Sequence, residues 1–227
     1  MLCCGIDEAG RGPLAGPVTA AAVVLTADFD LTILGDSKRL TPRRRELVAN
    51  RIFSGACLWA AGWTWPEEID RDNIHVASLN AMTRAFSSLL ERIDTLDETG
   101  MLRRAAGEPC RIDHSAGIRG VPPRQDSERP LVVVRVDGKF TPPISAPCEA
   151  VVGGDGRIAE IMAASIVAKV LRDRWMRRYH EFDPRFGFAS HKGYPSAAHK
   201  AALKTLGASP IHRRTFHGVP AHNVACA

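Results

Sequence analysis

The order of strand-like and helical segments constrains the fold of this chain more than any other feature of its sequence. Three runs rich in Val, Ala and other small apolar residues come first, at 2–6, 17–25 and 56–65. Two shorter runs come much later, at 131–136 and 148–152. Helical segments separate and follow these strands. The order predicts an α/β fold, a mixed five-stranded sheet flanked by helices, and argues against a repeat protein or a helix bundle.

The helical segments carry their own start signals. Thr41 is the expected N-cap before Pro42, and this helix should run to about Phe53. Longer helices are predicted over 66–93 and 158–182, and a last one over 196–206. Between the second helix and the fourth strand, residues 98–130 mix Gly, Pro and charged residues. We expect this stretch to be a surface insertion or a mobile loop.

Composition limits the possible classes of protein. At 227 residues, with 45% hydrophobic and 24% charged residues, the chain resembles soluble globular proteins of one domain. Its net charge of +5 favours an anionic partner weakly. The six cysteines form no C-x-x-C pair, so no zinc or redox site is predicted. The absence of signal-peptide features and of a membrane-length apolar run predicts a cytoplasmic protein with reduced thiols and no membrane contact.

Acidic residues stand where the predicted strands end. Asp7 follows the first strand, Asp137 the fourth, and Asp155 comes just after the fifth. Because ligand sites of open α/β sheets lie beyond strand ends, these carboxylates could converge on one point. Converged carboxylates repel one another unless a cation neutralises them, and all-oxygen ligand sets suit Mg²⁺ or Mn²⁺. Two such ions, roughly 4 Å apart, can hold an attacking water and a leaving oxygen of a phosphodiester in line.

Each acid also has an ordinary structural interpretation. Asp7 alone could be a polar residue at a strand end, and Asp137 with Gly138 could be a turn. Asp155 precedes a helix and could be its N-cap. A strand would point Glu8 away from Asp7, so Glu8 reaches the same site only if the strand breaks at once. The shared placement of the acids therefore carries the prediction.

Several motifs together resemble one known family, type 2 ribonuclease H (ribonuclease HII). They occur in the family's order and cover nearly the whole chain except the insertion. The motifs are GIDEAGRGPLAG at 5–16, DSKRL at 36–40, IDRDNI at 69–74, VDG at 136–138, GD at 154–155, AASIVAKVLRD at 163–173, HKGYP at 191–195 and SPIHRRTF at 209–216.

The resemblance implies a ribonuclease H-like catalytic domain over 1–184 and a C-terminal helical extension over 185–227 packed on it. It also implies hydrolysis of the RNA strand in RNA–DNA hybrids and incision 5′ of ribonucleotides embedded in duplex DNA, leaving a 3′-hydroxyl and a 5′-phosphate. The acids that match the family's catalytic and metal-binding set are Asp7, Glu8, Asp137 and Asp155.

The resemblance also implies how substrate is read. Gly10, Arg11 and Gly12 match a segment that contacts the ribose 2′-hydroxyl, the group that distinguishes RNA from DNA at one nucleotide. Tyr194 matches a tyrosine that packs at the RNA-to-DNA junction. The alternatives are a tight turn for the glycines and core packing for the tyrosine. Possible phosphate contacts, against ordinary solvated charge, are Lys38, His191, Lys192, Arg213 and Arg214.

Two departures from the family pattern stand out. Gly153 occupies the place before Gly154 and Asp155 where the family usually has Lys. The substitution alters charge near the site but removes no ligand. The stretch over 98–130 is longer than the family's usual connection, and its role is open.

Other functional classes fit the sequence less well. A phosphate-binding P-loop is excluded because Gly5-x4-Gly10 continues with Arg11 and Gly12 instead of Lys and Ser or Thr. A non-catalytic hybrid-binding protein would have little reason to keep four acids facing an anionic ligand. A junction-cutting nuclease of the same fold would not need the 2′-hydroxyl. We therefore expect a monomeric endoribonuclease that uses Mg²⁺ or Mn²⁺, with two ions during catalysis.

Overall fold

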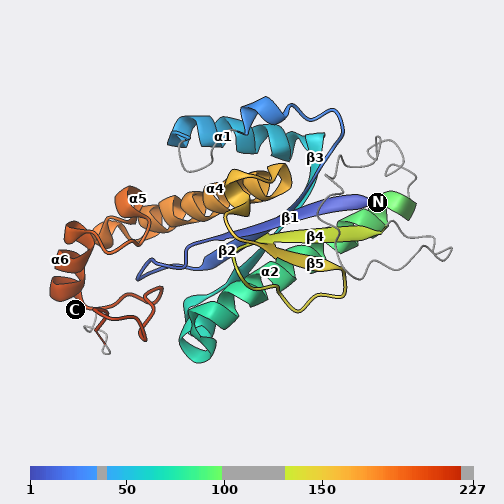
Figure 1. Ribbon diagram of the computed structural model, residues 1–227. Coiled ribbons are helices and arrows are strands. Elements are labelled where there is room, and N and C mark those ends of the chain that lie inside the picture. The colour runs from blue at the N-terminus through green and yellow to red at the C-terminus, as the bar shows by residue number, and fades with distance from the viewer. Residues whose placement is uncertain (35–39, 99–130, 221–227) are drawn as a thin grey trace.

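The computed structural model describes residues 1–34, 40–98 and 131–220. Five strands form one sheet in the order β3-β2-β1-β4-β5 (Figure 1). Their bounds are β1 Leu2–Ala9, β2 Val18–Leu25, β3 Cys57–Thr64, β4 Val132–Asp137 and β5 Cys148–Val151. The predicted mixed five-stranded sheet is confirmed.

Strand direction determines which residues meet at one end of the sheet. β1 pairs with β2 antiparallel and with β4 parallel, and β4 pairs with β5 parallel. Ile6 lies opposite Val136, so Asp7 and Asp137 are the next residues on two neighbouring parallel strands. Since both strands run the same way, their carboxyl ends lie at the same edge of the sheet.

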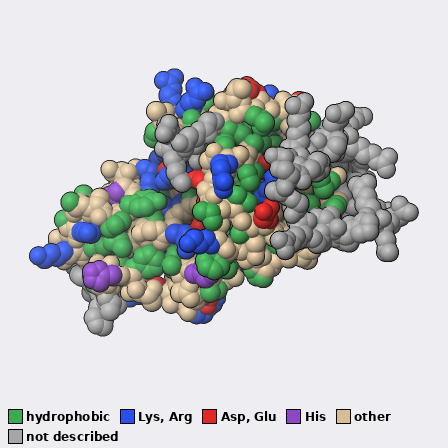
Figure 2. Space-filling model, viewed as in Figure 1, with side chains coloured by type: hydrophobic (Ala, Val, Ile, Leu, Met, Phe, Trp, Pro, Cys, Tyr) green, Lys and Arg blue, Asp and Glu red, His purple; other side chains and the backbone are tan. Residues whose placement is uncertain are grey.

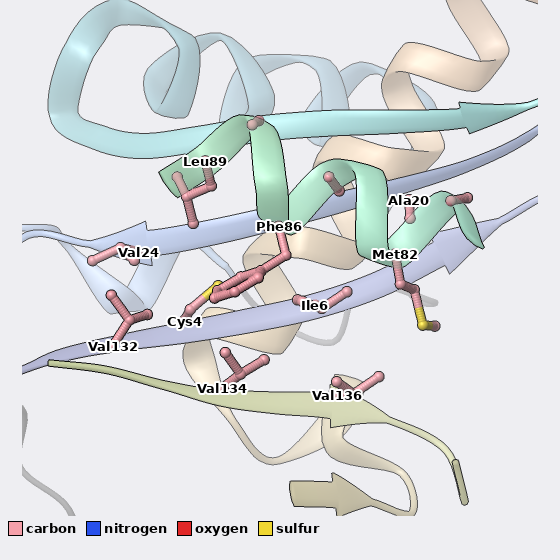
Figure 3. Packing of buried hydrophobic residues seen from close by; sticks show 14 of the residues in the cluster. Cys4, Ile6, Ala20, Val24, Met82, Phe86, Leu89, Val132, Val134 and Val136 are labelled. Carbon is pink, nitrogen blue, oxygen red and sulfur yellow. The ribbon is translucent and has the colours of Figure 1, made fainter. Parts of the chain in front are cut away.

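Helices cover both faces of the sheet (Figure 1). α1 (Pro42–Arg51) and α4 (Ala159–Phe182) pack on one face, and α2 (Pro66–Glu98) packs on the other. Figure 3 shows Cys4, Ile6 and Val134 of the sheet pointing toward Phe86 of α2. On the opposite face, a Cβ at Gly5 would lie 2.1 Å from the main chain of Glu160, so glycine lets α4 approach β1 closely.

The helix starts follow the predicted signals. Thr41 accepts a hydrogen bond from Arg44 N–H at 3.3 Å, which confirms it as the N-cap of α1. α1 ends at Arg51, two residues before the predicted end, because a π-helical turn η2 (Ile52–Ala56) continues the chain. α2 is broken at Asn73, whose φ is 69° and whose side chain accepts from the N–H groups of His75 and Val76.

The C-terminal segment packs against one end of α4. It contains η4 (Pro184–Phe186), α5 (Phe188–His191) and α6 (Ala197–Leu206), the last two of which are labelled in Figure 1. Its apolar side chains form a cluster with Leu14, Ala15 and Met176. The division of the chain at residue 184 stays a prediction. Residues 99–130 of the predicted insertion and Lys38 lie outside the described residues.

Candidate active site

Three carboxylates converge at the carboxyl end of β1 and β4. Asp7, Asp137 and Asp155 each offer an oxygen, and these atoms lie within 4.8 Å of one another. Asp7 and Asp155 are buried, and Asp137 is half-buried. The predicted convergence of three acids from distant parts of the chain is therefore present in the structure.

A short turn after β5 places the third acid. η3 (Gly154–Gly156) follows Gly153, which adopts a left-handed φ of 67°. The Asp137 carboxylate accepts hydrogen bonds from Gly154 N–H at 2.7 Å and Asp155 N–H at 3.4 Å. The N-cap of α4 is Ile158, so Asp155 is not the N-cap considered from the sequence. The turn instead directs Asp155 toward Asp137.

The electrostatics of Asp7 favour the binding of a cation by the cluster. Burial raises the pKa of Asp7 well above its usual value, and the charges of Glu8 and Asp137 raise this pKa further. A hydrogen bond with the Ser165 side chain and one from Glu8 N–H at 2.7 Å act in the opposite direction. A divalent cation would relieve this repulsion, and an all-carboxylate set suits Mg²⁺ or Mn²⁺.

Glu8 differs from the other three acids. β1 does not break after Asp7, because its pairing with β2 continues to Ala9 opposite Thr19. Glu8 is not among the carboxylates that lie within 4.8 Å of one another in the described part of the chain. Its side chain instead forms an ion pair with Arg11 at 3.2 Å. Glu8 is still close enough for its charge to raise the pKa of Asp7.

The glycine-rich loop and the predicted tyrosine lie next to each other. A Cβ at Gly12 would be 3.8 Å from the Tyr194 ring. Tyr194 is 42% exposed, so it is not a core residue. The Lys169 ammonium lies 5.6 Å from the centre of its ring. Arg11 and Gly12 are also exposed, so the loop and the tyrosine form one accessible surface.

The residues predicted to contact phosphate differ in how far they are exposed to solvent. The prediction for Arg213 is wrong, because its side chain is fully buried and donates to carbonyls of the loop after β1. His191 is half-buried, and its ring nitrogens lie 2.9 Å from Phe186 O and 3.2 Å from Gly193 N, within hydrogen-bonding reach of the main chain. The Lys192 ammonium lies against the carbonyls of Ala189 and Ser190. Arg214 is exposed.

Two residues near the site were not predicted. Ser165 hydrogen-bonds the Asp7 carboxylate, and Lys169 lies one helical turn further along α4, beside Tyr194. Lys169 also pairs with Asp173 at 2.8 Å. Ser165 and Lys169 are four residues apart on one predicted helix, and this spacing could have indicated that they share a face of it. In Figure 2, Lys and Arg side chains surround the middle of the face shown, with acidic side chains among them.

Comparison with known proteins assigns the family. The family model described as Ribonuclease HII matches residues 4–219 of the chain. The chain belongs to the ribonuclease HII family. It is 43% identical over 215 residues to ribonuclease HII of Dechloromonas aromatica, covering 95% of this chain and 90% of that protein. Ribonuclease HII of Treponema denticola is 42% identical, with 94% and 96% covered.

Solved structures share the fold. Ribonuclease H2 from Pyrococcus horikoshii OT3 superposes with a TM-score of 0.61 at 24% identity, covering 96% of this chain and 95% of that one. The ribonuclease H-like fold expected from the resemblance is confirmed.

Membership of the ribonuclease HII family identifies an endoribonuclease, a phosphodiester hydrolase that acts on RNA–DNA hybrids. Within the described residues, no helix combines the length and the apolar character needed to cross a bilayer.

Proposed function

We propose that this endoribonuclease is metal-dependent and also incises 5′ of single ribonucleotides embedded in duplex DNA, leaving a 3′-hydroxyl and a 5′-phosphate. The observation that carries the proposal is the convergence of Asp7, Asp137 and Asp155 within 4.8 Å. A cluster of carboxylates would repel an anionic substrate on its own. Such a cluster makes chemical sense at a phosphodiester only if it holds cations there.

The acids have distinct parts in this proposal. Asp7 and Asp137 hold Mg²⁺ or Mn²⁺ most directly, since they are adjacent on parallel strands. Asp155 and Glu8 complete the site, with Glu8 turning from its ion pair with Arg11. When bound, two such ions supply an activated water and stabilise the leaving oxygen. The Ser165 hydrogen bond orients the Asp7 carboxylate and favours its ionised form.

The exposed surface beside the acids accounts for substrate choice. Gly10, Arg11 and Gly12 bring the main chain close to the ribose 2′-hydroxyl, and Tyr194 packs at the junction between RNA and DNA. Lys169 lies beside Tyr194 and is placed to meet a backbone phosphate. Arg214, Lys192 and Lys38 supply further phosphate contacts, so binding should weaken as salt rises.

A pair of duplexes tests the function. One carries a single ribonucleotide and its twin is all DNA; each is incubated with Mg²⁺ and with Mn²⁺ in turn. We expect incision of the first duplex only, and only with metal. Asp7→Asn should lower the rate by at least about 100-fold while duplex binding persists, because the metal is lost and the phosphate contacts are not. Glu149→Gln, an acid on β5 paired with Arg135, is the matched control and should stay active.

Other outcomes identify the alternatives. A pure hybrid-binding protein would show no cutting by the unmodified chain with either metal. A junction nuclease would cut without regard to the 2′-hydroxyl, so both duplexes of the pair would behave alike. Either result contradicts the proposal.

The remaining expectations concern the cell. We propose that the protein acts as a monomer in the cytoplasm on hybrids and ribonucleotide-containing DNA. None of its described cysteines, Cys3, Cys4, Cys57 and Cys148, forms a disulfide, as suits a reducing compartment. The molar mass in solution, measured by light scattering, tests the monomer, for which 24.7 kDa is expected.

A further inference from the structure

Two buried arginines hold the glycine-rich loop from the inside. Arg172 of α4 and Arg213 of the C-terminal segment are both 0% exposed. Arg172 donates to the carbonyls of Pro17 at 2.9 Å, Ala15 at 3.1 Å and Lys192 at 3.0 Å. It therefore ties the loop after β1 to the segment that carries Tyr194.

Arg213 donates hydrogen bonds to carbonyls along the same loop, from Gly10 to Gly16. Its five hydrogen bonds, from 2.6 to 3.0 Å, end on the carbonyls of Gly10, Arg11, Pro13 and Gly16, the last of which accepts two. A planar guanidinium presents its N–H donors as a rigid fork, which suits several carbonyls arranged around one plane. A lysine ammonium has only three donors at one point and could not make this set of contacts.

The loop is shaped to admit these side chains. Gly10 has a φ of 100°, and a Cβ there would lie 2.1 Å from Arg172 Nε. Gly16 has a φ of 86°, and a Cβ there would lie 2.4 Å from the sulfur of Met176. Burial lowers the pKa of Arg172 to about 10 and of Arg213 to about 9, so both remain charged at neutral pH. Burying two cations is costly, which makes a purely space-filling role a poor explanation.

The hydrogen bonds from Arg213 determine the direction of neighbouring N–H groups in the loop, because peptide units are planar. In a planar trans peptide, the carbonyl of one residue and the N–H of the next point in opposite directions. The described residues contain no cis peptide. The carbonyls of Gly10 and Arg11 point inward to Arg213, so the N–H groups of Arg11 and Gly12 point away from it. Arg11 and Gly12 are exposed, and Gly12 lies beside Tyr194.

We propose that Arg172 and Arg213 are positioning residues that turn the main-chain N–H groups of Arg11 and Gly12 outward to read the ribose. The inference rests on the proposed function, because it concerns the same substrate-reading loop. It assigns a task to the C-terminal segment, which supplies Arg213, and to α4, which supplies Arg172 along with the Asp7 partner Ser165.

Charge-conserving variants test the proposal. Arg213→Lys and Arg172→Lys keep the charge but lose the planar set of donors. We expect kcat/KM on the single-ribonucleotide duplex to fall about 10- to 100-fold in each, as misplacement of a contact by an ångström does. Mn²⁺ binding measured by calorimetry should be unchanged, because the acid cluster is not touched.

A destabilised control separates positioning from mere loss of stability. Leu89→Ala removes a fully buried side chain of α2, on the other face of the sheet, and should lower Tm without touching the loop. Measured well below its Tm, this variant should keep kcat/KM within about twofold of the unmodified protein. If the lysine variants lose no more activity than Leu89→Ala, the positioning role is refuted.

Hydrogen exchange tests the same point in the unmodified protein, should the variants fail to fold. With EDTA present to prevent cleavage, the amides of Arg11 and Gly12 should exchange quickly in the free protein. They should become protected by the single-ribonucleotide duplex and not by its all-DNA twin. Slow exchange of both amides in the free protein would overturn the inference. If instead the unmodified protein cuts neither duplex, the proposed function itself has failed.

Discussion

At the scale of single residues, Asp7 shows how the site opposes stability. Burial and the neighbouring acids raise the pKa of its carboxyl group, so the ionised form destabilises the folded state at neutral pH. Because the folded protein binds this proton more tightly than the unfolded chain does, the free energy of unfolding rises as pH falls through the raised folded pKa of Asp7. Active sites commonly carry such a cost.

The first residue-scale prediction follows from the destabilising effect of ionised Asp7 on the folded state. Without metal at pH 8, Asp7→Asn should raise Tm, because it removes a buried charge and keeps the side-chain volume. Mn²⁺ should raise the Tm of the unmodified protein and leave that of Asp7→Asn nearly unchanged. Thermal unfolding with and without Mn²⁺ measures both effects. A lower Tm for Asp7→Asn in EDTA would show that the cluster is not strained by repulsion.

The second residue-scale prediction concerns Gly10. Gly55 has a similar φ of 95°, but a Cβ at this position would meet open space, so Gly55→Ala tests backbone strain alone. We expect it to cost about 1–2 kcal/mol, or a few degrees in Tm. Gly10→Ala adds a collision with Arg172 and should cost at least twice as much. Equal losses would show that the arginine moves aside freely.

At the scale of elements, α4 connects the parts of the site. Ser165 reaches Asp7, Lys169 lies beside Tyr194, and Arg172 holds the loop after β1. These residues are spaced three or four apart, so they share one side of the helix. The same helix packs its small apolar residues, such as Ala164 and Ala168, against the sheet. One rigid element therefore sets the distance between the acid cluster and the substrate-reading surface.

The prediction at this scale concerns the start of α1. Thr41 caps the helix through its side-chain oxygen, so Thr41→Ala should lower the free energy of unfolding by about 1 kcal/mol. Thr41→Ser keeps the oxygen and should recover most of this loss. Urea unfolding followed by circular dichroism measures both. Equal stability of the Ala and Ser variants would mean that the cap contributes nothing.

At the scale of the whole molecule, a histidine pair within the C-terminal segment links the main chain at Ser209 to that at Tyr194. His212 accepts from Ser209 N–H at 2.9 Å, and its other nitrogen lies 2.9 Å from His199. The second nitrogen of His199 then donates to the Tyr194 carbonyl at 2.9 Å. This pattern requires both rings to be neutral. Burial, and then the neighbouring His199, lower the pKa of His212 to about 3.

Stability should therefore depend on pH in a predictable direction. A folded pKa below the unfolded value of 6.5 means that the unfolded chain takes up the proton first. The free energy of unfolding should fall as pH decreases from about 6.5 toward 5, by at most about 1.4 kcal/mol per pH unit for each such histidine. His212→Gln should make this slope shallower. His217→Gln, which changes an exposed histidine, should preserve it. Identical slopes in all three proteins would contradict the neutral pair.

Local patterns in the sequence were enough to predict the strands, the helix starts and the acids at strand ends. A run of apolar residues indicates a segment that packs in a core, and Thr-Pro indicates a helix start, because both depend on near neighbours. The family motifs added the ribonuclease HII assignment, which comparison confirmed. Asp7, Asp137 and Asp155 could be predicted to converge because strand ends share an edge.

The burial of a charged side chain depends on contacts between distant segments, which local patterns do not contain. Arg213 and Arg214 are neighbours in one basic motif, yet the first is buried and the second is exposed. Nothing local distinguishes them, because the carbonyls that satisfy Arg213, such as that of Pro13, come from a segment 200 residues earlier. Glu8 was ambiguous for a similar reason. Its direction depends on how far β1 stays paired with β2, and pairing is a property of two segments together.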